Sequence, residues 1–112
     1  MKKIIPLLTI LISSVFTPAF ANEEIEARVS NGVTYVGKWG GQIHASVELI
    51  SGSTLRACYG DQPCFEGVPY EISDGAVVVE NSPHKWIYKP VSDGFDASYF
   101  KDGKKLSEAL LR

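Results

Sequence analysis

Two cysteines, Cys58 and Cys64, are the residues of the chain whose chemistry depends most on their surroundings. They could form a redox centre, bind a metal, remain free thiols or form a disulfide. A redox dithiol usually has two intervening residues at the start of a helix, where the thiolate is stabilised. Here five residues intervene, and Gly60 and Pro63 among them favour a loop. The spacing therefore argues against a redox centre.

Other side chains that could bind a metal or act in catalysis are scattered along the sequence. Zinc needs three or four ligands, whereas the only histidines, His44 and His84, stand alone. Four glutamates could act as acids or bases, but no serine sits in a nucleophile elbow and no glycine loop suits a phosphate. We therefore expect no metal, no cofactor and no enzymatic activity. The four glutamates are Glu48, Glu66, Glu71 and Glu80.

The N-terminus has the pattern of a secretory signal peptide. Lys2 and Lys3 precede a mostly apolar run, and Ala19-Phe20-Ala21 forms an A-x-A cleavage site. The apolar run is shorter than the roughly 20 residues that a membrane-spanning helix needs. We expect residues 1–21 to be removed and the protein to be periplasmic or secreted. The periplasm is inferred from the resemblance of the Lys-Lys start to bacterial leader peptides.

The expected mature chain is one small acidic domain. Residues 22–112 number 112 − 21 = 91, and their formal charge is 9 − 13 = −4 because both leader lysines are lost. The charges are interspersed, so no basic stripe marks a nucleic-acid or anionic-membrane partner.

An oxidising compartment makes a Cys58–Cys64 disulfide the best interpretation of the cysteine pair. The bridge would pin a connection between strands and hold Tyr59, Asp61 and Gln62 outward in a defined pose. Tyrosine is frequent at interface hot spots, and a stapled loop loses little entropy on binding. We therefore select Tyr59, Asp61, Gln62 and Phe65 as the candidate partner-contact loop, with a purely structural turn as the alternative.

The remainder of the chain alternates short strand patterns with turn signals. Period-2 alternation places Ala45, Val47 and Leu49 on one face of a strand, and Trp86 and Tyr88 on one face of another. Residues 105–112 suit either a strand or a short helix, and residues 22–30 suit a flexible tail or a short strand. Four dipeptides supply the positive φ angles of tight hairpin turns, namely Asn31-Gly32, Asp74-Gly75, Asp93-Gly94 and Asp102-Gly103.

These signals predict an all-β fold, an antiparallel up-and-down meander of seven to nine short strands. So short a meander protects its edges best by closing into a small barrel or half-barrel. Trp39, Trp86 and Tyr88 are predicted core residues. Together with Tyr35, Phe95 and Tyr99, they are expected to fill most of the interior, because small barrels have little free space.

Gly37-Lys38-Trp39 on the first expected strand is the G-x-W motif of lipocalins and the wider calycin group, which the chain resembles. Tyr59-Gly60, the later Asp-Gly turns and Arg112 fit the same layout. The resemblance implies a β-barrel closed by Trp39, with a late arginine packed over that tryptophan. The chain is much shorter than a lipocalin and lacks the middle motifs, so no ligand is implied.

These sequence patterns leave three classes of function. The first is a secreted binding module that contacts a protein or polymer through loops. Its most specific form is an inhibitor of a protease or lysozyme. The chain resembles small periplasmic inhibitors in size and expected location, although it does not match their motifs. The second is a carrier of a small apolar ligand, which requires a hollow interior. An enzyme is the third and the least supported.

Overall fold

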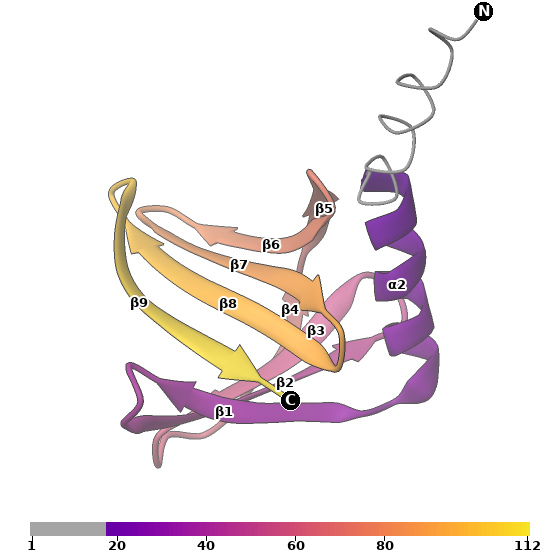
Figure 1. The fold of residues 1–112 in the computed structure, drawn as a ribbon. Helices are drawn as coiled ribbons and strands as arrows, with labels where there is room; N and C mark the ends of the chain where they lie inside the picture. Colours follow the sequence, from indigo (N-terminus) through magenta and orange to yellow (C-terminus); the bar gives the residue numbers. More distant parts are fainter. Residues whose placement is uncertain (1–17) are drawn as a thin grey trace, which may run out of the picture.

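Nine β-strands and one helix make up residues 18–112, the part of the chain that the computed structural model describes (Figure 1). Most of the expected leader, residues 1–21, lies outside the described residues. The predicted all-β fold is confirmed. The elements are α2 (Pro18–Asn31), β1 (Thr34–Trp39), β2 (Ile43–Ile50), β3 (Thr54–Tyr59), β4 (Phe65–Pro69), β5 (Glu71–Ser73), β6 (Ala76–Asn81), β7 (His84–Val91), β8 (Gly94–Lys101) and β9 (Lys104–Leu111).

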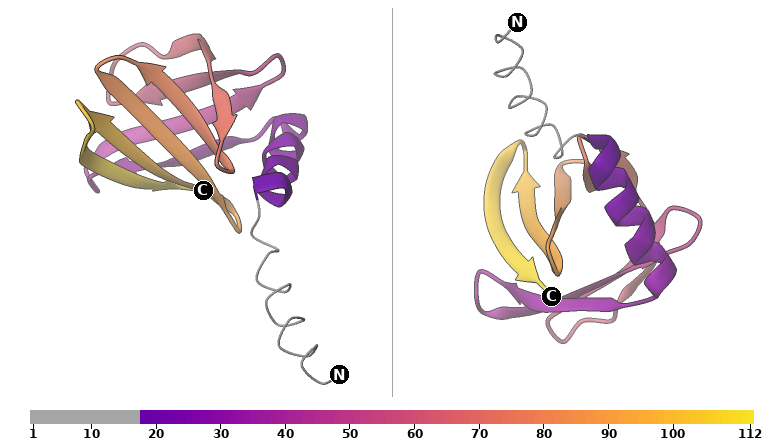
Figure 2. Two further views of the ribbon diagram at one scale, coloured as in Figure 1. Left: turned by 90° about the horizontal axis from the view of Figure 1, so that it is seen from above. Right: turned by 45° about the vertical axis from the view of Figure 1, so that its right-hand side comes forward.

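The strands form two antiparallel sheets in which neighbours in sequence are neighbours in space. One sheet has the order β1-β2-β3-β4 and the other the order β5-β6-β7-β8-β9. This is the predicted meander, and residues 104–111 join it as a strand rather than a helix. Figure 2 shows the two sheets curving around a common interior.

Backbone hydrogen bonds join the two sheets along β1 and β9, the first and last strands. Val36 and Arg112 exchange two such bonds, of 3.1 and 2.9 Å, and the Gly40 amide donates to the Glu108 carbonyl at 3.0 Å. Gly37 makes this seam possible, because a Cβ at this position would collide with the carbonyl oxygen of Leu110. At the opposite side a single residue, Tyr70, connects β4 to β5, and its amide donates to the Ser53 carbonyl at 3.1 Å.

Two of the four predicted Asx-Gly turns have the positive φ angles that tight hairpins require. Asp74 and Gly75 have φ angles of 52° and 75°, and Asp102 and Gly103 have φ angles of 53° and 78°. The prediction for Asn31-Gly32 is wrong as to the type of turn. Asn31 ends α2, and Gly32, with a φ of 62°, follows it in the left-handed conformation that commonly ends helices.

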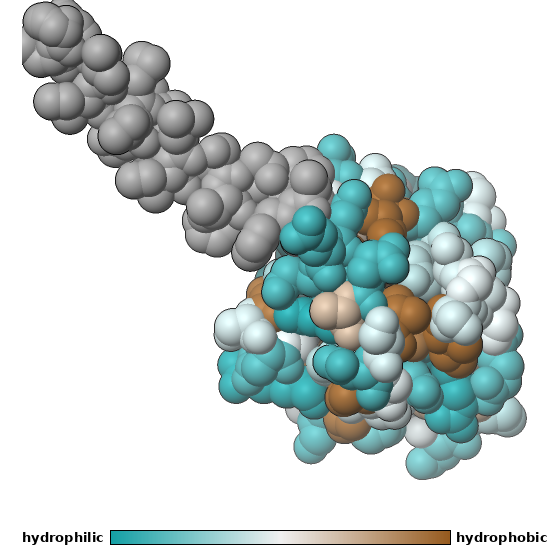
Figure 3. Space-filling model, turned by 90° about the vertical axis from the view of Figure 1, so that its right-hand side faces the viewer, coloured by the Kyte–Doolittle hydropathy of each residue, from teal (hydrophilic) through white to brown (hydrophobic). Residues whose placement is uncertain are grey.

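The tail or short strand expected at residues 22–30 is also wrong, because this segment is helical. α2 lies across one end of the two sheets (Figures 1 and 2) and buries Ile25 and Arg28 against them, with exposed fractions of 0% and 7%. Its other side is polar, and Figure 3 shows a mostly hydrophilic face with separate hydrophobic patches. Sequence reasoning missed the helix because its apolar positions are few.

The core lies between the sheets at the end that α2 covers. Alternate residues of β2 point into it as predicted, and Ala45, Val47 and Leu49 are all buried. The rings of Tyr35 and Phe95 meet edge to face, with centroids 5.1 Å apart. Arg28 packs over both rings, so this end of the molecule is filled.

Candidate functional site

A cavity of about 630 Å³ lies between the sheets, at the end opposite α2. The turns that follow β1, β3, β6 and β8 lie at this end of the sheets (left-hand side of Figure 1), and residues close to each turn line the cavity. The expectation that aromatic side chains fill most of the interior is therefore wrong for this half of the molecule. The cavity is lined by Trp39, Ile43, Leu55, Ala57, Tyr59, Phe65, Val68, Val79, Asn81, His84, Trp86, Tyr88, Tyr99, Leu106 and Ser107.

Tyr88 forms the floor of the cavity, where the open half meets the packed core. Its side chain is 5% exposed, and its ring lies edge-on to Phe95 with centroids 6.4 Å apart. Burial raises the pKa of the Tyr88 hydroxyl above the usual 10.0, and the charge of a nearby ionised Tyr59 would raise it further. The floor is therefore a neutral phenol under physiological conditions.

Three aromatic side chains of β7 and β8 form one wall. His84 and Trp86 are two residues apart on β7, and Trp86 lies opposite Tyr99 on β8. The Trp86 and Tyr99 centroids are 5.3 Å apart at an interplanar angle of 30°, and His84 stacks on Tyr99 at 18°. His84 Nδ1 lies 2.7 Å from Tyr99 Oη, a hydrogen-bond distance. We call these three residues the aromatic wall.

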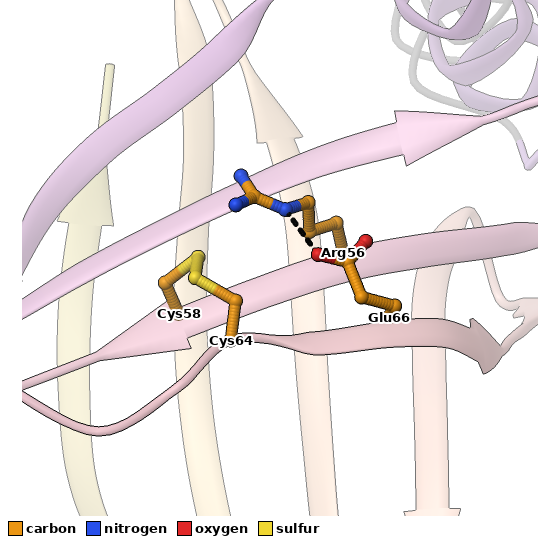
Figure 4. The surroundings of a disulfide bond; sticks show 4 residues. All are labelled: Arg56, Cys58, Cys64 and Glu66. Atoms are coloured by element: carbon orange, nitrogen blue, oxygen red, sulfur yellow. Dashed lines mark hydrogen bonds and ion pairs between the residues drawn. A yellow bond between two sulfur atoms is a disulfide. The ribbon is translucent and has the colours of Figure 1, made fainter.

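The facing side of the mouth comes from the first sheet and the disulfide loop. The predicted Cys58–Cys64 bridge is confirmed and joins the end of β3 to the start of β4 (Figure 4). Tyr59 and Phe65, each beside a cysteine, have ring centroids 5.6 Å apart. Both line the cavity, so the expected outward pose is wrong for Tyr59, whose side chain turns inward.

Irregular pairing between β3 and β4 shapes this rim. Leu55 lies opposite Val68 and Ala57 opposite Phe65, so that one residue of β3 faces two of β4. Gly67 adopts a φ of 60° in this bulge. On the outer face, Arg56 Nε lies 2.6 Å from Glu66 Oε2 (Figure 4), and the bulge is thereby tied to β3.

A second irregularity turns a leucine towards the mouth. Tyr99 pairs with Ser107 but Phe100 pairs with Lys105, so Leu106 is an extra residue of β9. Leu106 therefore lines the cavity together with Ser107. Leu106, Ile43 and Phe65 are each about half exposed, at 53%, 52% and 51%, and we call them the apolar rim.

No Asp, Glu, Lys or Arg occurs among the residues that line the cavity. Its polar groups are the hydroxyls of Tyr59, Tyr88, Tyr99 and Ser107, the Asn81 amide, the His84 imidazole and the two indole N–H groups. The arrangement suits a largely apolar, uncharged molecule with a few hydrogen-bonding groups.

The core and loop residues that were selected from the sequence lie in different parts of the structure. Tyr88 belongs to the core, whereas Trp39 and Trp86 are half-buried and line the cavity. Asp61 and Gln62 are exposed in the turn between the cysteines. Sequence reasoning missed Tyr99 and His84 as site residues, although His84 shares the inward alternation of Trp86 and Tyr88.

The arginine that the lipocalin resemblance assigns to Trp39 lies elsewhere. Arg112 is exposed, and its Nε lies 3.9 Å from Asp93 Oδ1. The arginine that covers aromatic rings is Arg28, at the other end of the interior from Trp39.

The other surfaces offer less to a ligand. A smaller hollow of about 410 Å³ lies on the outer face near the β6–β7 and β8–β9 turns and has charged walls, including Glu80, Lys85 and Asp102. Within residues 18–112, no three His, Cys, Asp or Glu side chains are grouped so as to bind a metal ion. In the same range no helix is both long and apolar enough to cross a membrane.

Comparisons with known proteins identify no relative of this chain. No family model matches it, and neither a curated protein nor a solved structure does. The site must therefore be interpreted from its own geometry.

Proposed function

We propose that this protein is a non-enzymatic binding protein that holds a small apolar ligand between its two sheets. The observation that carries the proposal is the cavity of about 630 Å³ without a charged lining residue, next to a fully packed core. Pockets for small molecules typically measure about 300–1,000 Å³ and combine apolar walls with a few polar groups. Ligand burial there would remove apolar surface from water on both partners.

A binding role also agrees better with the polar groups than catalysis does. His84 is the lining residue best suited to act as a general base near neutral pH, and its Nδ1 is already paired with Tyr99. No carboxylate lines the cavity to serve as its acid or orienting partner.

Both tryptophans of the chain, Trp39 and Trp86, line the cavity, so a bound molecule can be detected directly. We would titrate the protein with N-phenyl-1-naphthylamine, an uncharged probe whose fluorescence rises in apolar surroundings. We expect saturable binding at one site, with energy transfer from tryptophan to the probe.

A matched pair of variants tests the location of the probe. Ala57→Phe adds a ring to the cavity wall and should weaken probe binding at least about tenfold, because the ring occupies space that the probe needs. Val36→Phe adds the same ring to the exposed outer side of β1 and should leave binding unchanged. Equal affinities of the two variants would place the probe outside the cavity and overturn the proposal.

The apolar rim favours a second candidate, a protein or polymer partner bound at the mouth. Ile43, Phe65 and Leu106 expose about half of their surface, and the disulfide holds Phe65 in place. An inhibitor of a protease or lysozyme is one version of this candidate, with the loop between the cysteines entering the hydrolase. Asp61→Ala combined with Gln62→Ala changes this loop without altering the cavity lining, so unchanged partner binding would exclude the loop.

Native mass spectrometry of the protein from its own cells separates the two candidates. A bound small molecule supports the carrier, whereas a co-purifying protein supports the partner-binding role.

We further propose that the chain is exported and cleaved after Ala21. Asn22 would then begin α2 with a suitable cap, and Glu23 and Glu24 would favour the first turn. The intact mass should correspond to residues 22–112 with a disulfide.

A further inference from the structure

We infer that the ligand is an uncharged, flat molecule with a hydroxyl group, and that Tyr99, paired with His84, binds this hydroxyl at the mouth of the cavity. The inference rests on the proposed function and defines its ligand class. Three observations support it, namely the hydrogen-bonding capacity of the His84–Tyr99 pair, the planarity of the aromatic wall and the absence of charge from the lining.

The His84–Tyr99 pair leaves one donor and one acceptor unused, whichever way its hydrogen bond runs. If Tyr99 donates to His84 Nδ1, the Nε2–H group remains a donor and Tyr99 Oη remains an acceptor. If Nδ1–H donates to Tyr99, the phenol hydrogen remains a donor and Nε2 an acceptor. Nε2 points away from Tyr99, so a single ligand group pairs with the free side of Tyr99 Oη and not with both atoms. A ligand hydroxyl can donate to Oη in the first arrangement and accept from it in the second, whereas a ketone or ether accepts only and could not pair with Oη in the first.

The aromatic wall presents flat surfaces beside this polar pair. The rings of His84, Trp86 and Tyr99 are mutually inclined by only 18° to 31°. A planar ligand can stack on such a wall in an offset arrangement. His84 begins β7 near the mouth, whereas Tyr88, four residues further along, forms the floor. The hydroxyl would therefore lie near the mouth, and the apolar body would extend towards Tyr88, Leu55 and Val79.

The uncharged lining argues against fatty acids and other carboxylates. A carboxylate taken from water into this cavity would lose hydration and meet no arginine or lysine in return. The test is made at a slightly alkaline pH, where a free imidazole is neutral.

Isothermal titration calorimetry with three probes of nearly equal shape tests the inference. Naphthalene supplies the flat apolar body alone, 2-naphthol adds the hydroxyl, and 2-naphthoate adds a charge instead. We expect 2-naphthol to bind about tenfold more tightly than naphthalene, and 2-naphthoate to bind more weakly than both. Equal affinities for naphthalene and 2-naphthol, or tightest binding of 2-naphthoate, would overturn the inference and leave the carrier proposal standing.

Variants locate the hydroxyl. Tyr99→Phe keeps the ring but removes the phenol oxygen, and it should reduce the preference for 2-naphthol over naphthalene to less than about threefold. Tyr70→Phe removes a phenol that does not line the cavity and should keep the full preference. Naphthalene affinity confirms that each variant retains the cavity. A preference that survives Tyr99→Phe overturns the assignment, and failure of all three probes to bind the wild type overturns the carrier proposal and the inference together.

Discussion

The guanidinium group of Arg28 lies over the ring of Phe95, with Cζ 4.9 Å from the ring centroid. The same group donates hydrogen bonds to the carbonyl oxygens of Val91 and Gly94 at the β7–β8 turn. Glu24, one helical turn earlier, accepts a further bond at 3.3 Å. A buried charge thus ties α2 to the strand ends and closes the interior opposite the cavity.

Replacing Arg28 should destabilise the fold. Arg28→Met keeps an apolar stem but leaves the Val91 and Gly94 carbonyls without their donor, and bonds to charged groups contribute about 1.5–3 kcal/mol. We expect the free energy of unfolding, measured by urea denaturation, to fall by about 2–3 kcal/mol. Glu24→Gln removes only the half-exposed ion-pair partner and should cost less than about 1 kcal/mol. Similar losses in both variants would show that the carbonyl contacts contribute little.

Gly37 should tolerate no side chain at the β1–β9 seam. In Gly37→Ala the new methyl group would collide with the Leu110 carbonyl oxygen and lie 2.9 Å from Leu111 Cδ2. We expect a loss of about 1–3 kcal/mol, as is usual for overpacking, measured by chemical denaturation. Val36→Ala alters the neighbouring exposed position and should change stability by no more than about 0.5 kcal/mol. An unaltered unfolding midpoint in Gly37→Ala would mean that the strands separate easily.

Removal of the disulfide should affect both stability and ligand binding. A double Cys58→Ala and Cys64→Ala variant loses the constraint on a short loop, which the chain-entropy relation values at roughly 2–2.5 kcal/mol. Probe affinity should also fall, because Tyr59 and Phe65 adjoin the cysteines and line the mouth. Arg56→Gln removes the adjacent ion pair but keeps the bridge, and it should retain probe affinity. Unchanged affinity in the double alanine variant would show that the bridge does not organise the mouth.

Alkaline pH should destabilise the protein through Tyr88. Burial raises the folded-state pKa of this phenol above the usual 10.0, so the unfolded chain releases the proton first. The contribution to stability is therefore complete below pH 10 and is lost as the pH rises further. Burial raises the pKa of Tyr70 in the same direction. Urea denaturation across this range should show a shallower decline in Tyr88→Phe than in the wild type, and parallel declines would contradict the assignment to Tyr88.

The strands were predictable because their signals are local. Alternating patterns identified the inward faces of β2 and β7, and Asp74-Gly75 and Asp102-Gly103 form the expected hairpins. The β1–β9 seam could not be predicted from local signals. A glycine is required at position 37 because Leu110, on the distant strand β9, lies so close to it. α2 was missed for a related reason. Ile25 and Arg28 are stabilised by tertiary contacts with distant strands rather than by a strong amphipathic pattern.

The candidate site was predictable only in part. The sequence identified its cysteines and several of its aromatic residues, but the number of inward aromatic residues suggested a filled interior. Their distribution along the strands explains the difference. Tyr35 and Phe95 pack with Arg28 at one end, whereas Trp39, Trp86 and Tyr99 stand along the walls of the other. The two bulges, which place Gly67 and Leu106, depend on pairing register and carry no distinct sequence signal.

The β1–β9 seam has a consequence for the order in which the chain folds. Each of the other strand pairs joins neighbours in sequence and needs only a short loop to close, whereas the seam brings the two ends of the domain together. Loop-closure entropy rises with the length of chain enclosed, so the local hairpins should form first and the seam last. Until Arg112 emerges and reaches Val36, the apolar interior stays open along one side. A chain synthesised from its N-terminus must therefore remain free of aggregation until β9 is available to pair with β1.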